Sequence, residues 1–241
     1  MKKLYLLLIA VLAATVVHAQ PYKSPGDTAC MNVINFEEPT PYIQIDPQAQ
    51  NLWQIGAPHK SFFSQAYSVP NAIVTDTLNF YPDNNLSSFT LTVGTFNLGW
   101  YPWQMFIDFR HKFDTDTLRD GGYITISWDR GLTWANILDD TSSVWPFEVT
   151  PRNSWWPYYG NNNLYTAGDS LFNGEHGYSG KSAGWVHSCM AWYNIPVDHP
   201  ESYPGDTVLL RFNFVSDGNH HDREGWMIDH IRLFNIDLGS G

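Results

Sequence analysis

Apolar and polar residues alternate along much of this sequence, and a period of two is the pattern of a half-buried β-strand. In the segment 104–113 one side of the expected strand carries Met105, Ile107, Phe109, His111 and Phe113. The segments 123–128 and 207–215 alternate in the same way. No stretch shows a sustained helical period with capping residues at its ends. The pattern therefore predicts an all-β chain.

Turns are expected at frequent intervals between short strands. Proline and glycine, 15 and 18 residues in all, are spread along the chain at spacings that suit turns. Further strands are predicted at 31–36, 62–67, 72–75, 87–93, 134–138, 145–149, 184–193 and 226–236. Many short strands without helices are typical of an antiparallel sandwich or barrel. A sandwich needs large apolar side chains on both inner faces, which accounts for much of the 16% aromatic content.

The charge of the chain argues against several classes of protein. Lys and Arg number 13 and Asp and Glu number 24, which gives a formal net charge of -11. A nucleic-acid binder needs a basic face, and the sequence has no Lys/Arg cluster outside its first three residues. Only 15% of the residues are charged and aromatic residues are abundant, so neither disorder nor a coiled coil is expected.

Residues 1–19 have the features of a secretory signal peptide. Lys2 and Lys3 precede an almost unbroken apolar run, and Val17 and Ala19 are small enough for the cleavage site. The run is short for a membrane span, which needs about 20 apolar residues, and an uncleaved anchor helix is the alternative. We expect cleavage after Ala19, no later membrane span, and a secreted or cell-surface location.

The rest of the chain is predicted to form one domain. Residues 20–30 contain two prolines and a glycine and are expected to be a flexible lead. No later linker is long enough to divide the chain, and no internal repeat is visible. Residues 31–238 are therefore predicted to be a single β-sandwich domain.

No catalytic set of residues stands out. The sequence has no Gly-x-Ser-x-Gly elbow, no His-Glu-x-x-His and no Cys-x-x-Cys, and spacing alone identifies no glycosidase carboxylate pair. A polar loop could bind a transition metal but lacks any zinc spacing, and it contains Asp217, His220, His221 and Asp222. We expect that loop, and His176 likewise, to be solvated. The protein is therefore predicted not to be an enzyme.

Residues 127–134 read SWDRGLTW and fit the pattern Ser-x-Asp-x-Gly-x-Thr-Trp, known as an Asp box, at every fixed position. Asp129 is expected to accept backbone N–H bonds across a turn, and Gly131 to supply the positive φ of a tight hairpin. Asp boxes recur in the blades of sialidase propellers, whereas this sequence has one copy. The box therefore predicts a stable hairpin covered by Trp134, without a direct catalytic role.

Four motifs follow one another along residues 33–236. They are Asn35-Phe36-Glu37, the Asp box, Ser182-Ala183-Gly184-Trp185 and Gly225-Trp226-Met227-Ile228-Asp229. Their order resembles a family of bacterial secreted jelly-roll modules that are similar to MAM domains, to the accessory domain of immune-inhibitor-A-like proteases and, more distantly, to cleaved-adhesin domains of gingipain-type proteases. The resemblance implies an antiparallel jelly-roll β-sandwich.

Such modules commonly occur in multidomain exported proteins of Bacteroidetes-like bacteria, often ahead of a type IX secretion sorting domain. This chain departs from that pattern because it ends at Gly241 without a sorting domain. We therefore expect either a fragment of a longer parent protein or a different route to its place.

The last predicted strand carries a carboxylate among apolar residues. Met227, Asp229, Ile231 and Leu233 are predicted to share one face, and a buried carboxylate must be paired, hydrogen-bonded or bound to a metal. MAM-like and related jelly rolls often hold a structural cation between the first and last strands, so the resemblance implies Glu37 as a second ligand. Such oxygen ligands suit Ca²⁺. The alternative is an Asp229 that accepts bonds from backbone N–H groups and water.

The segment 153–163, NSWWPYYGNNN, is the candidate ligand platform. Its predicted ligand-binding residues are Trp155, Trp156, Tyr158, Tyr159 and Asn161. Exposed aromatic rings can stack on sugar faces, and Asn amides can bond hydroxyl groups. A second loop-like cluster contains Trp100, Tyr101 and Trp103. The alternative is that these rings cover the open edges of the sandwich.

Three functions fit these features. The first is a non-catalytic extracellular binding or adhesion module whose partner is a glycan or a surface protein. The second is an accessory domain of a secreted protease or glycosidase, and the third is a polysaccharide hydrolase or lyase that uses a jelly-roll groove. The lack of a catalytic motif favours the first two.

The two cysteines, Cys30 and Cys189, are predicted to be joined because an exported chain meets oxidising conditions. A loop this long could add about 4–5 kcal/mol in the chain-entropy model, and two buried free thiols are the alternative. The intact mass of the purified protein should rise by two hydrogen atoms on reduction. An unchanged mass would show that the thiols are free.

Overall fold

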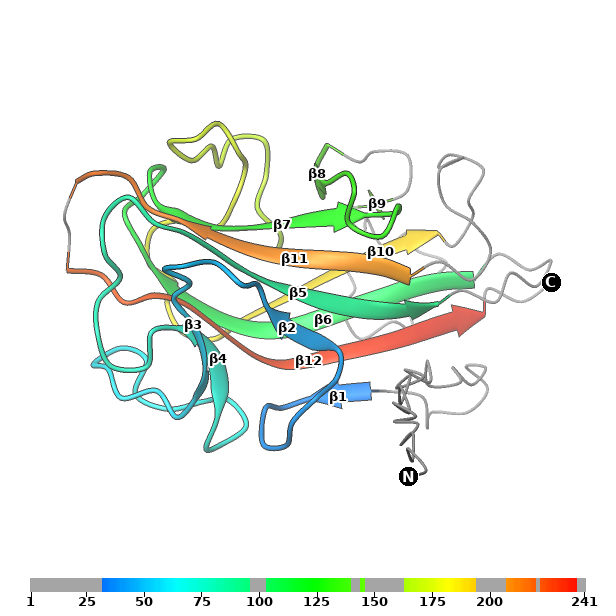
Figure 1. Ribbon diagram of the computed structural model, residues 1–241, viewed down its shortest axis with the longest axis horizontal. Helices are drawn as coiled ribbons and strands as arrows, with labels where there is room; N and C mark the ends of the chain where they lie inside the picture. The colour runs from blue at the N-terminus through cyan, green and yellow to red at the C-terminus, as the bar shows by residue number, and fades with distance from the viewer. Residues whose placement is uncertain are drawn as a thin grey trace, which may run out of the picture.

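The computed structural model describes residues 32–95, 103–139, 144–145, 163–193, 207–219 and 222–237. Within these ranges the secondary structure consists of β-strands joined by turns and bends, and no helix occurs. It follows that no described helix is long and apolar enough to cross a membrane. Figure 1 shows the strands in two facing layers.

The larger layer is a sheet of seven described strands. In order across the sheet they are β3 (Trp53–Gly56), β4 (Ala72–Thr75), β12 (Gly225–Asp237), β6 (Trp103–Asp114), β10 (Val186–Tyr193) and β9 (Val144–Trp145), and β1 (Asn32–Ile34) also pairs with β12. Residues 227–228 of β12 pair with β4, and residues 231–233 pair with β1. Two short strands therefore share one edge of β12.

The smaller layer is a sheet of five described strands. In order they are β2 (Ile43–Ile45), β5 (Leu86–Thr95), β11 (Thr207–Val215), β7 (Gly121–Ser127) and β8 (Ala135–Asn136). The chain changes sheet from β5 to β6 to β7, and again from β10 to β11 to β12. This exchange between facing antiparallel sheets makes the fold a jelly-roll β-sandwich, as the sequence predicts.

Most of the predicted strands are confirmed. The segments 72–75 and 207–215 coincide with β4 and β11, and the other confirmed strands differ from their predictions at the ends. The strand predicted at 62–67 is wrong, because these residues form bends. The carboxylate of Glu224 accepts the backbone N–H groups of Phe62 at 2.7 Å and Phe63 at 2.6 Å, which gives this backbone a partner other than a neighbouring strand.

Strands β2 and β3 were not predicted from the sequence. They contain three and four residues, respectively, and such short segments show too few repeats for a period of two to be recognised. β3 carries one of the buried core residues, Trp53, whose side chain is only 2% exposed. β3 therefore contributes to the core although its sequence pattern is weak, while β2 only packs Ile43 against it.

Trp226 lies in the core between the two sheets. Its side chain is fully buried, and the ring centroids of Trp53, Tyr178 and Phe212 lie 5.7, 5.7 and 5.9 Å from its own. Gly122 in the opposite sheet makes room for it, because a Cβ atom there would lie 2.0 Å from Trp226 Cε3. The inward face predicted for β11 is also buried and contains Val208, Leu210, Phe212 and Phe214.

A β-bulge at Asp229 and His230 reverses the faces of β12. Asp229 pairs with Arg110 and Arg232 with Asp108, so β12 has one residue more than β6 between these pairs, and His230 has a φ of 50°. The extra residue shifts the alternation of side chains by one.

The prediction that Met227, Asp229, Ile231 and Leu233 share one face is therefore wrong. Ile231 and Leu233 belong to the main core cluster, whereas Met227 packs with Phe63 and Val74 in a second cluster. Because Met227 and Asp229 precede the extra residue, the bulge separates them from the two later apolar side chains.

His111 anchors a buried chain of hydrogen bonds. Trp226 Nε1 donates to His111 Nδ1 at 3.0 Å, so the ring proton of His111 lies on Nε2, 2.9 Å from Ser188 Oγ. Ser188 Oγ in turn donates to the carbonyl oxygen of Asn163 at 2.7 Å. Burial lowers the pKa of His111 to about 3, so the ring stays neutral at physiological pH.

This neutral ring should make stability depend on pH. The pKa of His111 is about 3 in the folded chain and 6.5 in its ordinary state, so the unfolded chain binds the proton more tightly. The contribution is full above about pH 6.5 and declines as the pH falls toward 3. Between pH 7 and pH 5 the wild type should lose about 2 kcal/mol more unfolding free energy than His111→Gln. Denaturant titrations at both values measure this difference, and equal losses in the two proteins would contradict it.

Candidate functional site

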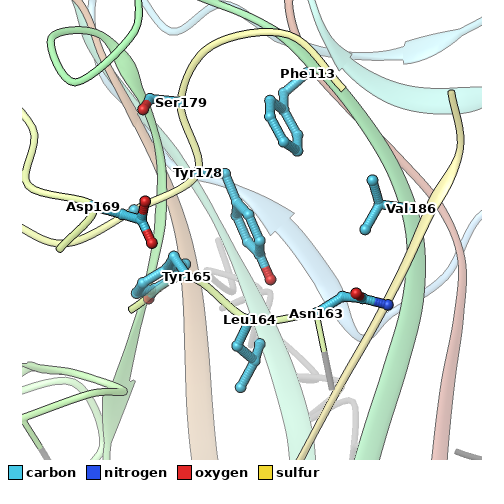
Figure 2. Close-up of a pocket in the computed structure, with 9 residues that line it drawn as sticks. Phe113, Asn163, Leu164, Tyr165, Asp169, Tyr178, Ser179 and Val186 are labelled. Atoms are coloured by element: carbon cyan, nitrogen blue, oxygen red, sulfur yellow. The ribbon is translucent and has the colours of Figure 1, made fainter. Parts of the chain in front are cut away.

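A pocket of about 320 Å³ lies where the loop 163–180 meets the end of β6 and the start of β10 (Figure 2). This volume is at the low end of the range of about 300–1,000 Å³ that is typical of small-molecule sites. The residues that line the pocket are Phe113, Asn163, Leu164, Tyr165, Asp169, Gly177, Tyr178, Ser179 and Val186.

The loop that forms the pocket is fixed to β7 by backbone and side-chain bonds. Tyr178 N donates to Gly122 O at 2.7 Å, and Gly122 N donates to Tyr178 O at 3.0 Å. Tyr165 Oη accepts the N–H of Ile124 at 3.0 Å. Asp169 closes a turn of the loop, because its Oδ2 accepts from both N and Oγ1 of Thr166. The wall of the pocket is therefore preorganised.

Tyr178 joins the pocket to the core of the domain. Its ring centroid lies 4.5 Å from that of His111 and 4.9 Å from that of Tyr165, and its residue is only 6% exposed. Its hydroxyl oxygen is buried and lies near the Ser188 side chain, without a hydrogen bond of normal geometry. Burial raises the pKa of Tyr178 above its ordinary value, so the phenol keeps its proton.

Two further polar groups of the pocket have capacity for a ligand. Thr166 N and Oγ1 both donate to Asp169 Oδ2, which leaves Oδ1 able to accept a hydrogen bond. Ser179 Oγ accepts the N–H of Leu118 at 3.0 Å, which leaves its own proton able to be donated. Figure 2 shows Asp169 and Ser179 on one side of the Tyr178 ring and Phe113 and Val186 on the other, so the lining combines polar and apolar groups.

The Asp box folds as the sequence predicts. Asp129 Oδ1 accepts the N–H of Thr133 at 2.8 Å, and Oδ2 accepts its hydroxyl at 2.6 Å. Gly131 has a φ of 89°, and Trp134 covers the turn by donating from Nε1 to Gly131 O at 3.0 Å. The guanidinium of Arg211 lies 3.9 Å above the Trp134 ring. The side chains of Ser127, Asp129, Thr133 and Trp134 thus hold the hairpin together.

Glu37 and Asp229 each hold one end of the segment 68–71. Glu37 Oε1 and Oε2 accept from N and Nδ2 of Asn71 at 3.0 and 3.2 Å. Asp229 is fully buried, and its oxygens accept from N and Oγ of Ser68 at 2.7 and 2.8 Å and from His230 N at 2.6 Å. Backbone N–H groups therefore bind Asp229, which is the alternative that the sequence leaves open.

Calcium at this place stays a hypothesis. Ca²⁺ takes six to eight oxygen ligands, whereas all four carboxylate oxygens of Glu37 and Asp229 already accept from N–H or O–H donors. Across the described ranges, no three His, Cys, Asp or Glu side chains come together as a metal site. The donors that surround both carboxylates do not fit a cation without rearrangement.

Several predicted residues lie outside the described ranges. They are the signal peptide 1–19, the lead 20–30, Cys30, Trp100, Tyr101, Trp155, Trp156, Tyr158, Tyr159, Asn161, His220 and His221. The aromatic platform and the disulfide therefore stay predictions, and Cys189, the second partner of that disulfide, is buried in β10. Asp217 belongs to a structural contact, since its carboxylate accepts from Arg119 Nε at 2.8 Å and Asn219 N at 2.7 Å.

Sequence reasoning did not single out Asp169, Tyr178 or Ser179. These residues lie in a segment rich in Gly, Asn, Asp and Ser, which reads as turns and shows no period. The signal that could have marked them is the pair Tyr165 and Tyr178, two aromatic residues in a segment otherwise composed mainly of turn residues. Their convergence with Phe113 depends on pairing between segments far apart in the sequence.

Comparison with known proteins finds no matching family model and no matching curated protein. Among solved structures, the CBM22-1 xylan-binding domain from Paenibacillus barcinonensis Xyn10C has 12% identity and a TM-score of 0.39, covering 86% of this chain and 95% of that chain. The K2 cleaved adhesin domain of Lys-gingipain has 12% identity and a TM-score of 0.45, covering 84% and 98%.

The C-terminal CBM6 of LamC, a marine laminarinase from Zobellia galactanivorans, has 14% identity and a TM-score of 0.36, covering 85% of this chain and 98% of that chain. A cleaved-adhesin domain is thus among the similar structures, while the resemblance to MAM and immune-inhibitor-A-like domains stays a prediction. At these identities and scores no ligand can be transferred to this chain.

Loss of the Ser68 hydroxyl should weaken the domain. Ser68→Ala removes one donor from the buried Asp229 carboxylate, and we expect the unfolding free energy to fall by about 1–3 kcal/mol. Ser61→Ala, an exposed position in the same loop, is the matched control and should change stability by less than about 0.5 kcal/mol. Equal stability of the two variants in denaturant titrations would show that the hydroxyl contributes nothing.

Chelation of the wild-type protein tests the calcium hypothesis. If Glu37 and Asp229 hold Ca²⁺, EDTA should lower the Tm of the wild type, and excess Ca²⁺ should restore it. An unchanged Tm would decide against the metal and leave the carboxylates to their hydrogen-bond donors, which include Ser68, Asn71 and His230.

Proposed function

We propose that this protein is a non-catalytic extracellular binding module whose pocket takes a neutral sugar residue of a glycan. The observation that carries the proposal is the composition of the pocket, in which unused hydrogen-bonding groups face an apolar wall. A sugar ring has the same division, with hydroxyl groups at its edge and C–H groups on its faces. The export expected from residues 1–19 fits a module that meets glycans outside the cell.

The polar groups of the pocket match hydroxyl groups better than charged ones. Asp169 Oδ1 can accept from a sugar hydroxyl, and Ser179 Oγ can donate to one. Both tyrosines of the pocket keep their protons because burial raises their pKa values. Asp169 is then the lining residue that carries charge at neutral pH, and its carboxylate repels an acidic sugar. The pocket therefore favours a neutral residue.

Binding without hydrolysis follows from the same set of residues. Glycosidases use two carboxyl groups on opposite sides of the scissile bond, about 5–10 Å apart. Of the residues that line this pocket, Asp169 is the single carboxylate. Its Oδ2 is committed to Thr166, which holds the loop rather than a reacting group. We therefore assign the pocket to recognition.

The aromatic platform at 153–163 is a second element of the proposal. Trp155 and Trp156 belong to a segment that directly precedes Asn163 and Leu164, two residues of the pocket wall. A polymer seated in the pocket could continue along such rings, since every sugar residue has a face for stacking.

A glycan array with neutral polysaccharides, followed by calorimetric titration of the best ligand, tests the proposal. Ser179→Ala should weaken binding by about two- to tenfold, the value of one hydrogen bond. Its Tm should change little, because the exposed Leu118 N–H that donates to Ser179 Oγ can bond water instead. Val186→Phe should abolish binding by filling the pocket. Ser170→Ala, in the same loop but outside the pocket, is the matched control and should bind as the wild type does.

Three results would decide against the pocket. These are a wild type that binds no neutral glycan, a Val186→Phe variant that binds normally, and a loss of binding confined to Trp155→Ala and Trp156→Ala. The last result would move recognition to the aromatic platform and leave the pocket as structure only.

A further inference from the structure

The outer face of the larger sheet carries a continuous row of rings and cations. Lys181 Nζ lies 4.3 Å and Lys112 Nζ 5.0 Å from the centre of the Phe62 ring. Lys112 Nζ also lies 5.2 Å from the centre of the Trp185 ring. The Trp185 and Tyr67 rings are 5.5 Å apart, and Arg110 Cζ lies 5.1 Å from the centre of the Tyr67 ring. We call this row, Phe62, Tyr67, Arg110, Lys112, Lys181 and Trp185, the ring–cation strip.

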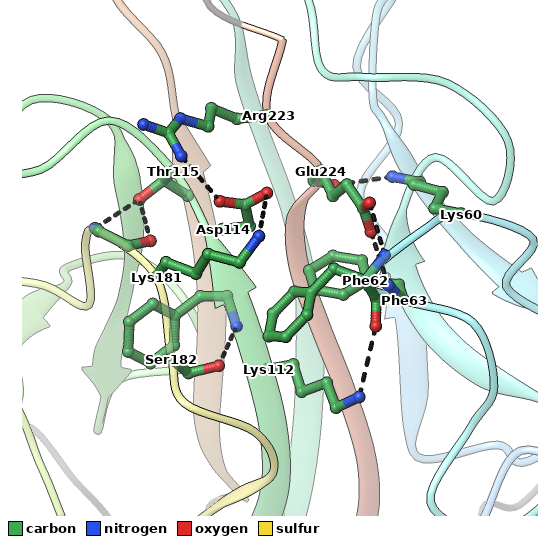
Figure 3. Close-up of polar contacts among 12 residues, drawn as sticks. Lys60, Phe62, Phe63, Lys112, Asp114, Thr115, Lys181, Ser182, Arg223 and Glu224 are labelled. Atoms are coloured by element: carbon green, nitrogen blue, oxygen red, sulfur yellow. Dashed lines mark hydrogen bonds and ion pairs between the residues drawn. The ribbon is translucent and has the colours of Figure 1, made fainter.

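The loop that supplies two of the rings is tied to β12. Figure 3 shows the Glu224 carboxylate accepting the backbone N–H groups of Phe62 and Phe63, at 2.7 and 2.6 Å. Lys60 Nζ donates to the carbonyl oxygens of Thr75 at 2.9 Å and Glu224 at 2.7 Å, and this lysine is buried. Asp229 holds Ser68 next to Tyr67. The ring positions are therefore set before a ligand arrives.

The charges on this face leave an excess of cations. Asp114 is shared by Lys181 at 3.4 Å and Arg223 at 3.2 Å, so one carboxylate faces two cations (Figure 3). Arg110 and Lys112 lie over aromatic rings. Glu224, the other carboxylate of this face in Figure 3, is engaged by backbone N–H groups. Asp108, on the same face of β6 as Arg110, is paired with Arg232. Arg110, Lys112, Lys181 and Arg223 therefore outnumber the carboxylates Asp114 and Glu224 around the strip.

The strip is open to solvent. The Tyr67 residue is 45% exposed and the Lys181 side chain 49% exposed, while Phe62, Lys112 and Trp185 are partly exposed. Phe62 and Trp185 also pack against the second core cluster, so part of each ring has a structural role. Cations over aromatic rings stabilise a fold, but that role does not require the Tyr67 ring and the Lys181 side chain to be about half exposed. Partial exposure leaves ring surface and ammonium groups available to a partner.

We propose that the ring–cation strip binds an acidic polysaccharide, one that bears carboxylate or sulfate groups. Such a polymer repeats a ring with apolar C–H faces and a fixed negative charge. The strip places an aromatic ring next to a cation several times in succession. Its contacts run in the order Lys181, Phe62, Lys112, Trp185, Tyr67 and Arg110. Lys and Arg side chains pair with carboxylate and sulfate, and aromatic rings stack on sugars.

This site differs from the proposed pocket in position and in charge preference. The strip lies over β6, the residues before β10, and the loop 60–68, and none of its residues lines the pocket. The Debye length is about 8 Å at physiological ionic strength, so carboxylates elsewhere on the acidic chain are largely screened from a polymer on the strip. Contact charges on the strip then decide which polymer binds.

Binding of dextran sulfate, polygalacturonate and neutral dextran to the full chain tests the proposal. We expect binding of at least one acidic polymer and none of neutral dextran, with affinity falling as salt rises. Arg110→Gln and Lys112→Gln should each weaken binding about three- to fivefold, and Tyr67→Ala about three- to tenfold. Arg130→Gln, which removes the same charge on the Asp box hairpin, is the matched control and should bind as the wild type does.

The two acidic polymers separate carboxylate from sulfate recognition. Lys181 lies outside the long strands, so its substitution should disturb the fold least. Lys181→Gln therefore replaces the other variants if they lower Tm. No binding of either acidic polymer at low salt would overturn the proposal, as would an equal loss in Arg130→Gln. Tighter binding of a single-stranded oligonucleotide would also overturn it, since bases can stack on the same rings. Neutral-glycan binding and its loss in Val186→Phe test the pocket alone, so the two sites can fail separately.

Discussion

The burial of Trp226 between the two sheets is the contact on which both candidate sites depend. Its ring fills the space left by Gly122, where even a Cβ atom would collide with it. On the inner side its indole N–H fixes His111, and Tyr178 of the pocket packs against both rings. Glu224, two residues earlier and just before β12, accepts the backbone N–H of Phe62 on the outer side. Residues 224–226 therefore contact both the pocket wall and the ring–cation strip.

β12 pairs with two different strands along one edge, and the bulge at Asp229 lies between the two pairings. Before the bulge, β12 pairs with β4 and contributes Met227 to the second cluster, with Phe63 and Val74. After the bulge, β12 pairs with β1 and contributes Ile231 to the main core cluster. Asp229 and Glu37 hold the segment 68–71 at this change of partner. The Asp229 carboxylate can be buried there because donors from Ser68 and from the bulge residue His230 converge on it. A regular strand without the bulge would not bring these donors together.

The period of two predicted most strands because strand geometry depends mainly on neighbours in sequence. It failed at 62–67, where a distant carboxylate takes the backbone N–H groups, and at Asp229, where one extra residue changes the face of every later side chain. The Asp box was predicted in detail, since its bonds join residues within four positions. The pocket was not predicted, because Phe113, Asp169 and Tyr178 meet only through sheet pairing.

The two proposed sites differ in charge and lie on opposite faces of the larger sheet. Phe113 of the pocket and Lys112 of the ring–cation strip are adjacent on β6, so their side chains point away from each other. Salt would weaken binding at the strip, because screening acts on charge pairs and leaves hydrogen bonds to hydroxyl groups nearly unchanged. A neutral glycan in the pocket and an acidic polymer on the strip are therefore distinguished by how their affinities respond to ionic strength.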